Sequence, residues 1–142
     1  MLKGIPAILS PDLMKVLMEM GHGDEIVLAD GNFPSASHTQ NLLRCDGHGI
    51  PALLEAILKF FPLDTYVEHP VTLMDVVEGE PFQPTIWQDF EKVIQEEHGP
   101  ALQMEYLDRF TFYERAKKAY AIVATGEAAQ YANIILKKGV VK

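Results

Sequence analysis

Short apolar runs alternate with segments of helical periodicity along most of this chain. The strand-like runs cover residues 26–29, 42–45, 71–77, 102–107, 120–124 and 134–136. The helix-like segments cover residues 11–20, 51–61, 84–98 and 109–118, and the polar composition of residues 30–40 predicts a loop. Such alternation favours an α/β fold with helices on a mixed, largely parallel sheet. We therefore predict a single three-layer domain over residues 1–142.

The composition narrows the class of protein. Hydrophobic residues make up 48% of the 142 residues, which is enough for a buried core without disulfides. The only cysteine, Cys45, has no partner within the chain, and this fits a reducing cytoplasm. We see no signal-peptide pattern, and no apolar run approaches the roughly 20 residues that span a bilayer. The net charge of −8 argues against nucleic-acid binding, because phosphate contacts need clustered Lys and Arg.

Two side chains that handle protons bracket the first strand-like run. A helix that begins at the cap residue Ser10 is predicted to end near Gly21, and His22 follows it. Asp30 stands at the far end of the run. Taken alone, His22 is explained by the helix dipole and Asp30 by a turn. An imidazole, with an ordinary pKa of about 6.5, also donates and accepts protons well, so this corner is a candidate ligand site.

Two stretches near the C-terminus carry further polar groups. Residues 109–115, Arg-Phe-Thr-Phe-Tyr-Glu-Arg, form either an amphipathic helix with Glu114 and Arg115 in solvent or part of a site. Residues 131–133, Tyr-Ala-Asn, form either a capped turn or a sugar or carbonyl site, since Tyr and Asn both donate and accept hydrogen bonds. Phosphate-binding loops, dinucleotide fingerprints and nucleophile elbows are absent from the sequence. The five histidines are scattered, so we expect no metal site.

Several blocks of sequence, taken together, point to one family. They are Leu-Lys-Gly-Ile-Pro at 2–6, Ser-Pro-Asp-Leu at 10–13, Glu-Met-Gly-His-Gly-Asp-Glu at 19–25, Asp30, Arg-Phe-Thr-Phe-Tyr-Glu-Arg-Ala at 109–116, Thr-Gly-Glu at 125–127 and Tyr-Ala-Asn-Ile-Ile-Leu-Lys-Lys-Gly-Val at 131–140. In these blocks the chain closely resembles the L-fucose mutarotases, and the resemblance is weak over residues 61–103. The related D-ribose pyranases share the first histidine and aspartate and the Tyr-Ala-Asn block. They lack the block at 109–115, which favours the fucose branch.

The resemblance implies an isomerase without a cofactor that interconverts sugar anomers. It also implies a toroidal homodecamer of α/β subunits with sites near subunit contacts. Phe33, Phe82 and Trp87 are candidates either for such contacts or for the core of one subunit. Residue by residue, the resemblance makes His22 the proton donor and assigns sugar binding to Asp30, Arg109, Tyr131, Ala132 and Asn133.

Anomer exchange needs one proton delivered to the ring oxygen and one removed from the anomeric hydroxyl. We predict that His22 exchanges the ring-oxygen proton and that Asp30 holds a sugar hydroxyl or orients His22. Tyr113 and Tyr120 are the two candidates for relaying the anomeric proton. A D-ribose pyranase acting by the same ring opening and a non-catalytic sugar-binding protein are the alternatives.

Overall fold

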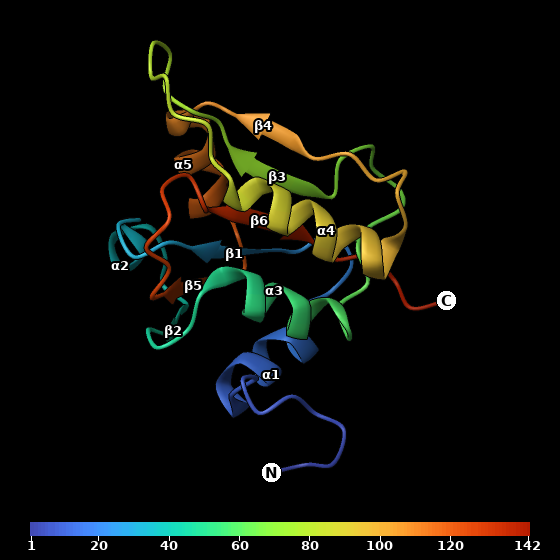
Figure 1. The fold of residues 1–142 in the computed structure, drawn as a ribbon. Helices are drawn as coiled ribbons and strands as arrows, with labels where there is room; N and C mark the ends of the chain where they lie inside the picture. The colour runs from blue at the N-terminus through green and yellow to red at the C-terminus, as the bar shows by residue number, and fades with distance from the viewer.

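The computed structural model describes residues 1–142 and is built around one six-stranded sheet (Figure 1). The strands lie in the order β2-β5-β1-β6-β3-β4. Only β6 runs antiparallel to its neighbours, β1 and β3, and every other pairing is parallel. The mixed, largely parallel sheet is thus confirmed. Its strands are β1 (Glu25–Ala29), β2 (Leu42–Cys45), β3 (Val71–Met74), β4 (Glu105–Leu107), β5 (Ala121–Thr125) and β6 (Ile134–Lys137).

Helices cover both faces of the sheet, which gives the three predicted layers (Figure 1). One face packs against α1 (Pro11–Glu19), α3 (Ile50–Leu58) and α4 (Ile86–His98) in a core cluster of 26 buried residues. The other face packs against α5 (Arg109–Lys117) in a cluster of 8, with α2 (Ser35–His38) beside it. Alternate residues of β1 enter the two clusters, as the two-residue period of a strand requires. None of the helices is both long and apolar enough to cross a membrane.

Two helices start at side-chain caps: α1, which precedes His22, and α5, which carries Arg109 and Tyr113. The Leu13 N–H donates to the Ser10 hydroxyl at 3.2 Å, and Pro11 occupies the first turn of α1, where its missing N–H costs nothing. The Thr111 N–H donates to the Asp108 carboxylate at 3.2 Å at the start of α5. These caps fix the residues at which α1 and α5 begin.

The structure adds one short helix to the predicted elements and shifts the ends of four others. Residues 35–38, predicted as loop, form the short helix α2. The sequence did not indicate this helix because four residues are too few to show helical periodicity. The strands predicted over 71–77 and 102–107 are shorter, because β3 and β4 pair only from Thr72 to Met74. The helix predicted over 51–61 runs from Ile50 to Leu58, and the helix predicted over 84–98 begins two residues later, at Ile86, and ends at His98 as predicted.

Candidate functional site

A pocket of about 320 Å³ opens where β1 ends and β6 begins. Because β6 is antiparallel to β1, the residues just before β6 lie beside the residues just after β1. The volume is at the small end of the range for small-molecule sites. The pocket brings together four of the predicted sugar-binding residues and one candidate relay. Its lining consists of Asp30, Asn32, Phe33, Met74, Val77, Arg109, Tyr113, Gln130, Tyr131 and Asn133.

Asp30 and Asn133 join the two strand ends at the floor of this pocket. The Asp30 N–H donates to Asn133 Oδ1 at 2.8 Å, and both residues are buried. The Asn32 N–H donates to Asp30 Oδ1 at 3.0 Å. Burial raises the pKa of the Asp30 carboxyl, although nearby N–H groups, including that of Ala132, act against the rise. Ala132, the fifth predicted sugar-binding residue, is fully buried and does not line the pocket.

Arg109 and Tyr113 come from one face of α5. They are four residues apart, so they are neighbours along the helix surface. Arg109 Nε donates to Tyr113 Oη at 2.9 Å, and the guanidinium lies 5.3 Å from the centre of the Tyr113 ring. The Phe33 ring packs edge-on against the Tyr113 ring, with centroids 5.4 Å apart. The buried Phe112 side chain holds α5 on the sheet and so sets the position of this cation and phenol.

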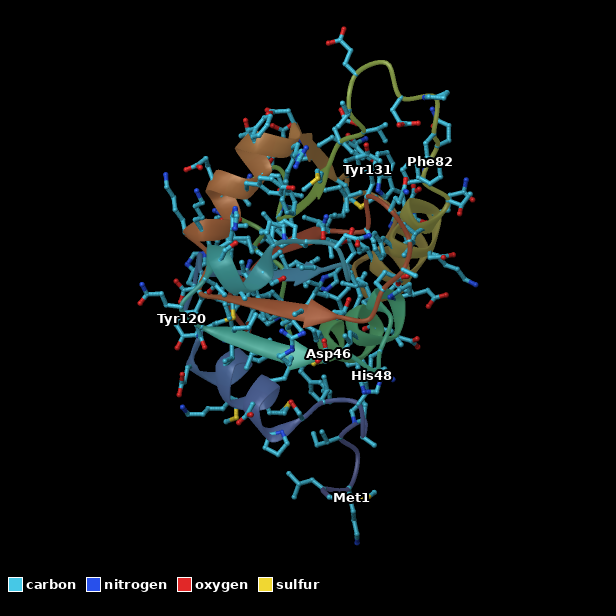
Figure 2. All side chains as sticks on the ribbon, turned by 90° about the vertical axis from the view of Figure 1, so that its left-hand side faces the viewer. Met1, Asp46, His48, Phe82, Tyr120 and Tyr131 are labelled. Atoms are coloured by element: carbon cyan, nitrogen blue, oxygen red, sulfur yellow. The ribbon has the colours of Figure 1, made fainter.

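Tyr131 forms the wall of the pocket nearest the segment that precedes α4. It is the only non-glycine residue with a positive φ, at 58°. Its hydroxyl accepts from the Val77 N–H at 3.4 Å, and its carbonyl accepts from the indole N–H of Trp87 at 2.8 Å. The Phe82 ring lies beside it with centroids 6.1 Å apart, and Figure 2 shows the two rings near each other below the projecting loop.

His22 lies at the opposite end of β1 from Asp30, and a strand of five residues spans about 17 Å. Its Nε2 is 3.0 Å from Oδ1 of Asp64, and its ring packs on Tyr66 with centroids 5.2 Å apart. Asp64 is only 4% exposed and also accepts from the Tyr66 N–H at 3.0 Å. Burial by itself raises the pKa of Asp64, but the Tyr66 N–H and the His22 ring outweigh it, and the pKa is lowered. Within the chain it is therefore Asp64, not Asp30, that contacts His22.

The two candidate relay tyrosines lie at different ends of the sheet. Tyr113 lines the pocket, whereas Tyr120 stands at the start of β5 beside the start of β1. The Tyr120 hydroxyl donates to Glu19 at 2.8 Å, and Figure 2 shows Tyr120 well apart from Tyr131. Tyr120 therefore lies at the same end of the sheet as His22.

The sequence predicted that Arg115 would lie in solvent if residues 109–115 formed an amphipathic helix, but in the structure this side chain is partly buried. Its guanidinium donates to Glu25 at 2.7 Å and to Glu105 at 2.6 Å, which ties α5 to β1 and β4. These ion pairs are partly buried and give the arginine a structural explanation. No group of three or more His, Cys, Asp or Glu side chains is arranged to hold a metal ion.

Comparison with known proteins bears on what this arrangement is. Residues 3–141 match the model of a family described as the RbsD / FucU transport protein family. The chain belongs to this family. The resemblance found in the sequence blocks is thereby confirmed, and the six-stranded layered fold is one that the RbsD/FucU family shares.

Relatives of the RbsD/FucU family match almost the whole chain. A human protein named fucose mutarotase is 52% identical over 98% of this chain and 94% of its own length. An L-fucose mutarotase of Histophilus somni is 49% identical over 99% of this chain and 97% of its own length. The crystal structure of the fucose mutarotase from Streptococcus pneumoniae in complex with L-fucose has a TM-score of 0.95 and 57% identity, over 99% of this chain and 100% of that one. Bacillus subtilis RbsD complexed with D-ribose, at 24% identity and a TM-score of 0.70 over 94% and 95% of the chains, shares the fold.

Sequence reasoning within the RbsD/FucU family missed several residues that the structure places at the two ends of β1. Asp64 is 42 positions from His22, and no spacing rule connects an isolated carboxylate to a histidine so far away. Met74 and Val77 lie in a segment of weak resemblance, where only their apolar character was visible. Trp87 stood out as the single tryptophan, but its hydrogen bond to the backbone of Tyr131 has no sequence signature.

Proposed function

We propose that this protein is an L-fucose mutarotase, which interconverts the α and β anomers by opening and reclosing the pyranose ring. The observation that carries the proposal is the pocket between β1 and β6, in which Asp30, Arg109 and Asn133 converge. The proposal is supported by the 57% identity to a fucose mutarotase that was crystallised with L-fucose.

The lining of the pocket suits a deoxy sugar. Carboxylate, guanidinium, amide and phenol groups offer donors and acceptors for ring hydroxyls. Phe33, Met74 and Val77 form an apolar part of the same lining. L-fucose carries a methyl group where most hexoses carry a hydroxymethyl group, so an apolar wall favours it over a sugar whose hydroxyl would lose its hydrogen bonds to water. We assign the methyl group to this apolar wall.

Ring opening needs only proton transfers. As the bond between C1 and the ring oxygen breaks, the ring oxygen takes up a proton and the anomeric hydroxyl loses one, which leaves an aldehyde. The C1–C2 bond then turns, and reclosure returns both protons. We assign the ring-oxygen proton to His22 and the anomeric proton to Tyr113, the relay candidate that lines the pocket. Positioned acids and bases of this kind typically contribute about 10²–10⁴-fold in rate.

Asp64 prepares His22 for this exchange. The lowered pKa of Asp64 keeps the carboxylate ionised, so it accepts a hydrogen bond from the Nε2–H of His22. The other ring nitrogen, Nδ1, is then the one that donates to and accepts from the sugar.

One chain does not bring His22 to the pocket, because β1 separates them. We therefore propose that His22 of a neighbouring copy completes each site. A ring of identical chains repeats such a head-to-tail contact and gives every chain one site. The decamer and the cytoplasmic location implied by the resemblance are part of this proposal and stay predictions.

Exchange NMR on equilibrated sugars tests the function. Anomeric protons of L-fucose, and then of D-ribose, are followed with and without protein, using the wild type and His22→Ala. Faster α/β exchange of fucose that is lost in His22→Ala is the expected result. Acceleration confined to pyranose and furanose forms of ribose assigns the protein to the pyranase branch. Binding of fucose without faster exchange makes it a sugar-binding protein.

Mixed oligomers test the shared site. His22→Ala and Arg109→Ala are each expected to be inactive alone. When both variants are co-expressed and mix at random in a ring, about a quarter of the sites combine an intact His22 with an intact Arg109 from the neighbour. Recovery of activity toward that fraction is the expected result. If mixed oligomers form and stay inactive, each chain carries its own site and the shared arrangement is wrong.

A further inference from the structure

The turn that leads into β6 is held in an unfavourable backbone conformation. Tyr131, with φ of 58°, lies in the left-handed region, which a residue with a Cβ rarely adopts. Such conformations persist where the surrounding contacts hold them, and they occur often at functional sites. The question is therefore which contacts hold Tyr131.

The peptide unit between Tyr131 and Ala132 is held through its carbonyl. Its carbonyl accepts from the indole N–H of Trp87 at 2.8 Å, which is a well-formed hydrogen bond. The N–H of the same peptide unit belongs to Ala132, which is fully buried between Tyr131 and Asn133, two residues of the pocket lining. Trp87 therefore sets the plane of a peptide that links two residues of the pocket lining, Tyr131 and Asn133.

The neighbouring contacts make this turn part of the site. The Tyr131 side chain lines the pocket, and two residues later Asn133 accepts from the Asp30 N–H at 2.8 Å. If the carbonyl of Tyr131 turned away from Trp87, the backbone between Tyr131 and Asn133 would turn with it, and both side chains would move relative to the sugar.

We propose that Trp87 is a positioning residue for the sugar site, which acts through the backbone of Tyr131 and does not touch the substrate. Trp87 is absent from the pocket lining, and its half-buried ring instead packs on Tyr106 with centroids 5.0 Å apart. The inference rests on the proposed function for the identity of the sugar. It extends that function by tying affinity to the start of α4, outside the residues that the family resemblance assigns.

Trp87→Phe is the decisive variant, because it keeps an aromatic ring and removes the N–H donor. A net hydrogen bond contributes about 1 kcal/mol, so we expect the KM for L-fucose to rise about fivefold while kcat stays within about twofold. Tyr106→Phe is the matched control: it removes a hydroxyl beside the same indole, keeps the ring contact, and is expected to leave KM unchanged. The single tryptophan adds a direct readout, because indole fluorescence of the wild type should change as fucose is added.

The outcomes separate this inference from the proposed function. In an active wild type, an unchanged KM in Trp87→Phe overturns the positioning role. So does an equal loss in Trp87→Phe and Tyr106→Phe, which would mark general disruption of the region. If the wild type does not accelerate exchange, the proposed function fails, and the comparison passes to fucose affinity measured by NMR titration. Weaker binding in Trp87→Phe alone then supports the positioning role, and equal binding overturns it.

Discussion

Replacing Asp64 by Asn removes a charge from beside His22 while keeping the shape of the side chain. In the wild type, one oxygen of Asp64 accepts from the Tyr66 N–H at 3.0 Å and lies 3.0 Å from His22 Nε2. The amide oxygen of Asn can accept both bonds, so the ring should keep its place. Hydrogen bonds to charged groups contribute about 1.5–3 kcal/mol and neutral ones about 0.5–1.5 kcal/mol. The difference of about 1–1.5 kcal/mol corresponds to a fall in kcat of roughly 5- to 12-fold.

Asp64→Ala is the harsher member of the series, because it leaves the Tyr66 N–H and the His22 ring without an acceptor. We expect a fall in kcat of roughly 100-fold, since the orientation of the ring is lost as well as the charge. The assay is exchange NMR at saturating L-fucose. The control is Asp46→Asn, which alters an exposed ion pair with Arg44 and should change nothing measurable.

The same series has a stability readout. The pKa of Asp64 is lowered in the folded chain, so its carboxylate stabilises the fold above the ordinary carboxyl range, and this contribution disappears as the pH falls through the folded-state value. Asp64→Asn should therefore unfold at a lower temperature than the wild type at pH 7, and the gap should close in strong acid. A folded Asp64→Asn protein with wild-type kcat would refute the reasoning about His22, whatever its unfolding temperature.

Three further predictions concern the scaffold of the site. Asp30→Asn should abolish fucose binding yet raise the unfolding temperature at pH 7. Burial raises the pKa of the Asp30 carboxyl, so its charged form costs stability above the ordinary pKa range of a carboxyl. Thermal scans should therefore show that the higher unfolding temperature of the variant returns to the wild-type value near pH 3. Arg115→Met should lower the free energy of unfolding by about 1–3 kcal/mol in urea titrations, because Glu25 and Glu105 lose their shared cation; unchanged stability would show that the network contributes nothing. Phe112→Ala empties a fully buried position under α5 and should cost about 3–5 kcal/mol, together with fucose affinity, since α5 carries two pocket residues; a loss below 1 kcal/mol would contradict this packing.

The sequence was informative where local chemistry decides the structure. The cap at Ser10, the helix end near Gly21 and the apolar runs predicted all six strands and four of the five helices, because caps, helix ends and periodicity act within a few residues. The helix α2, with four residues, is too short for these signals to predict. Contacts such as Asp64 with His22 depend on strand order, which no local pattern encodes.

The candidate site shows the same division. Asp30 and Asn133 are 103 positions apart, and only the antiparallel pairing of β6 with β1 brings them into contact. The family resemblance supplied four residues of the pocket lining, Asp30, Arg109, Tyr131 and Asn133, but not the separation of His22 from them. That separation follows from a strand direction, since His22 precedes β1 and Asp30 follows it.

The central place of β6 has a consequence for the order in which the protein folds. β6 is the last strand along the chain, yet it lies between β1 and β3, so the strands β2, β5 and β1 are joined to β3 and β4 only through it. Until β6 inserts, the growing chain holds two separate sheet fragments, each with an exposed edge open to wrong pairing. The floor of the pocket needs Asn133, which enters with the same strand. The sheet should therefore be completed, and the pocket should become able to bind a sugar, in a single late step. A nascent chain in which β6 has not yet been synthesised should have an incomplete sheet and should not bind the sugar.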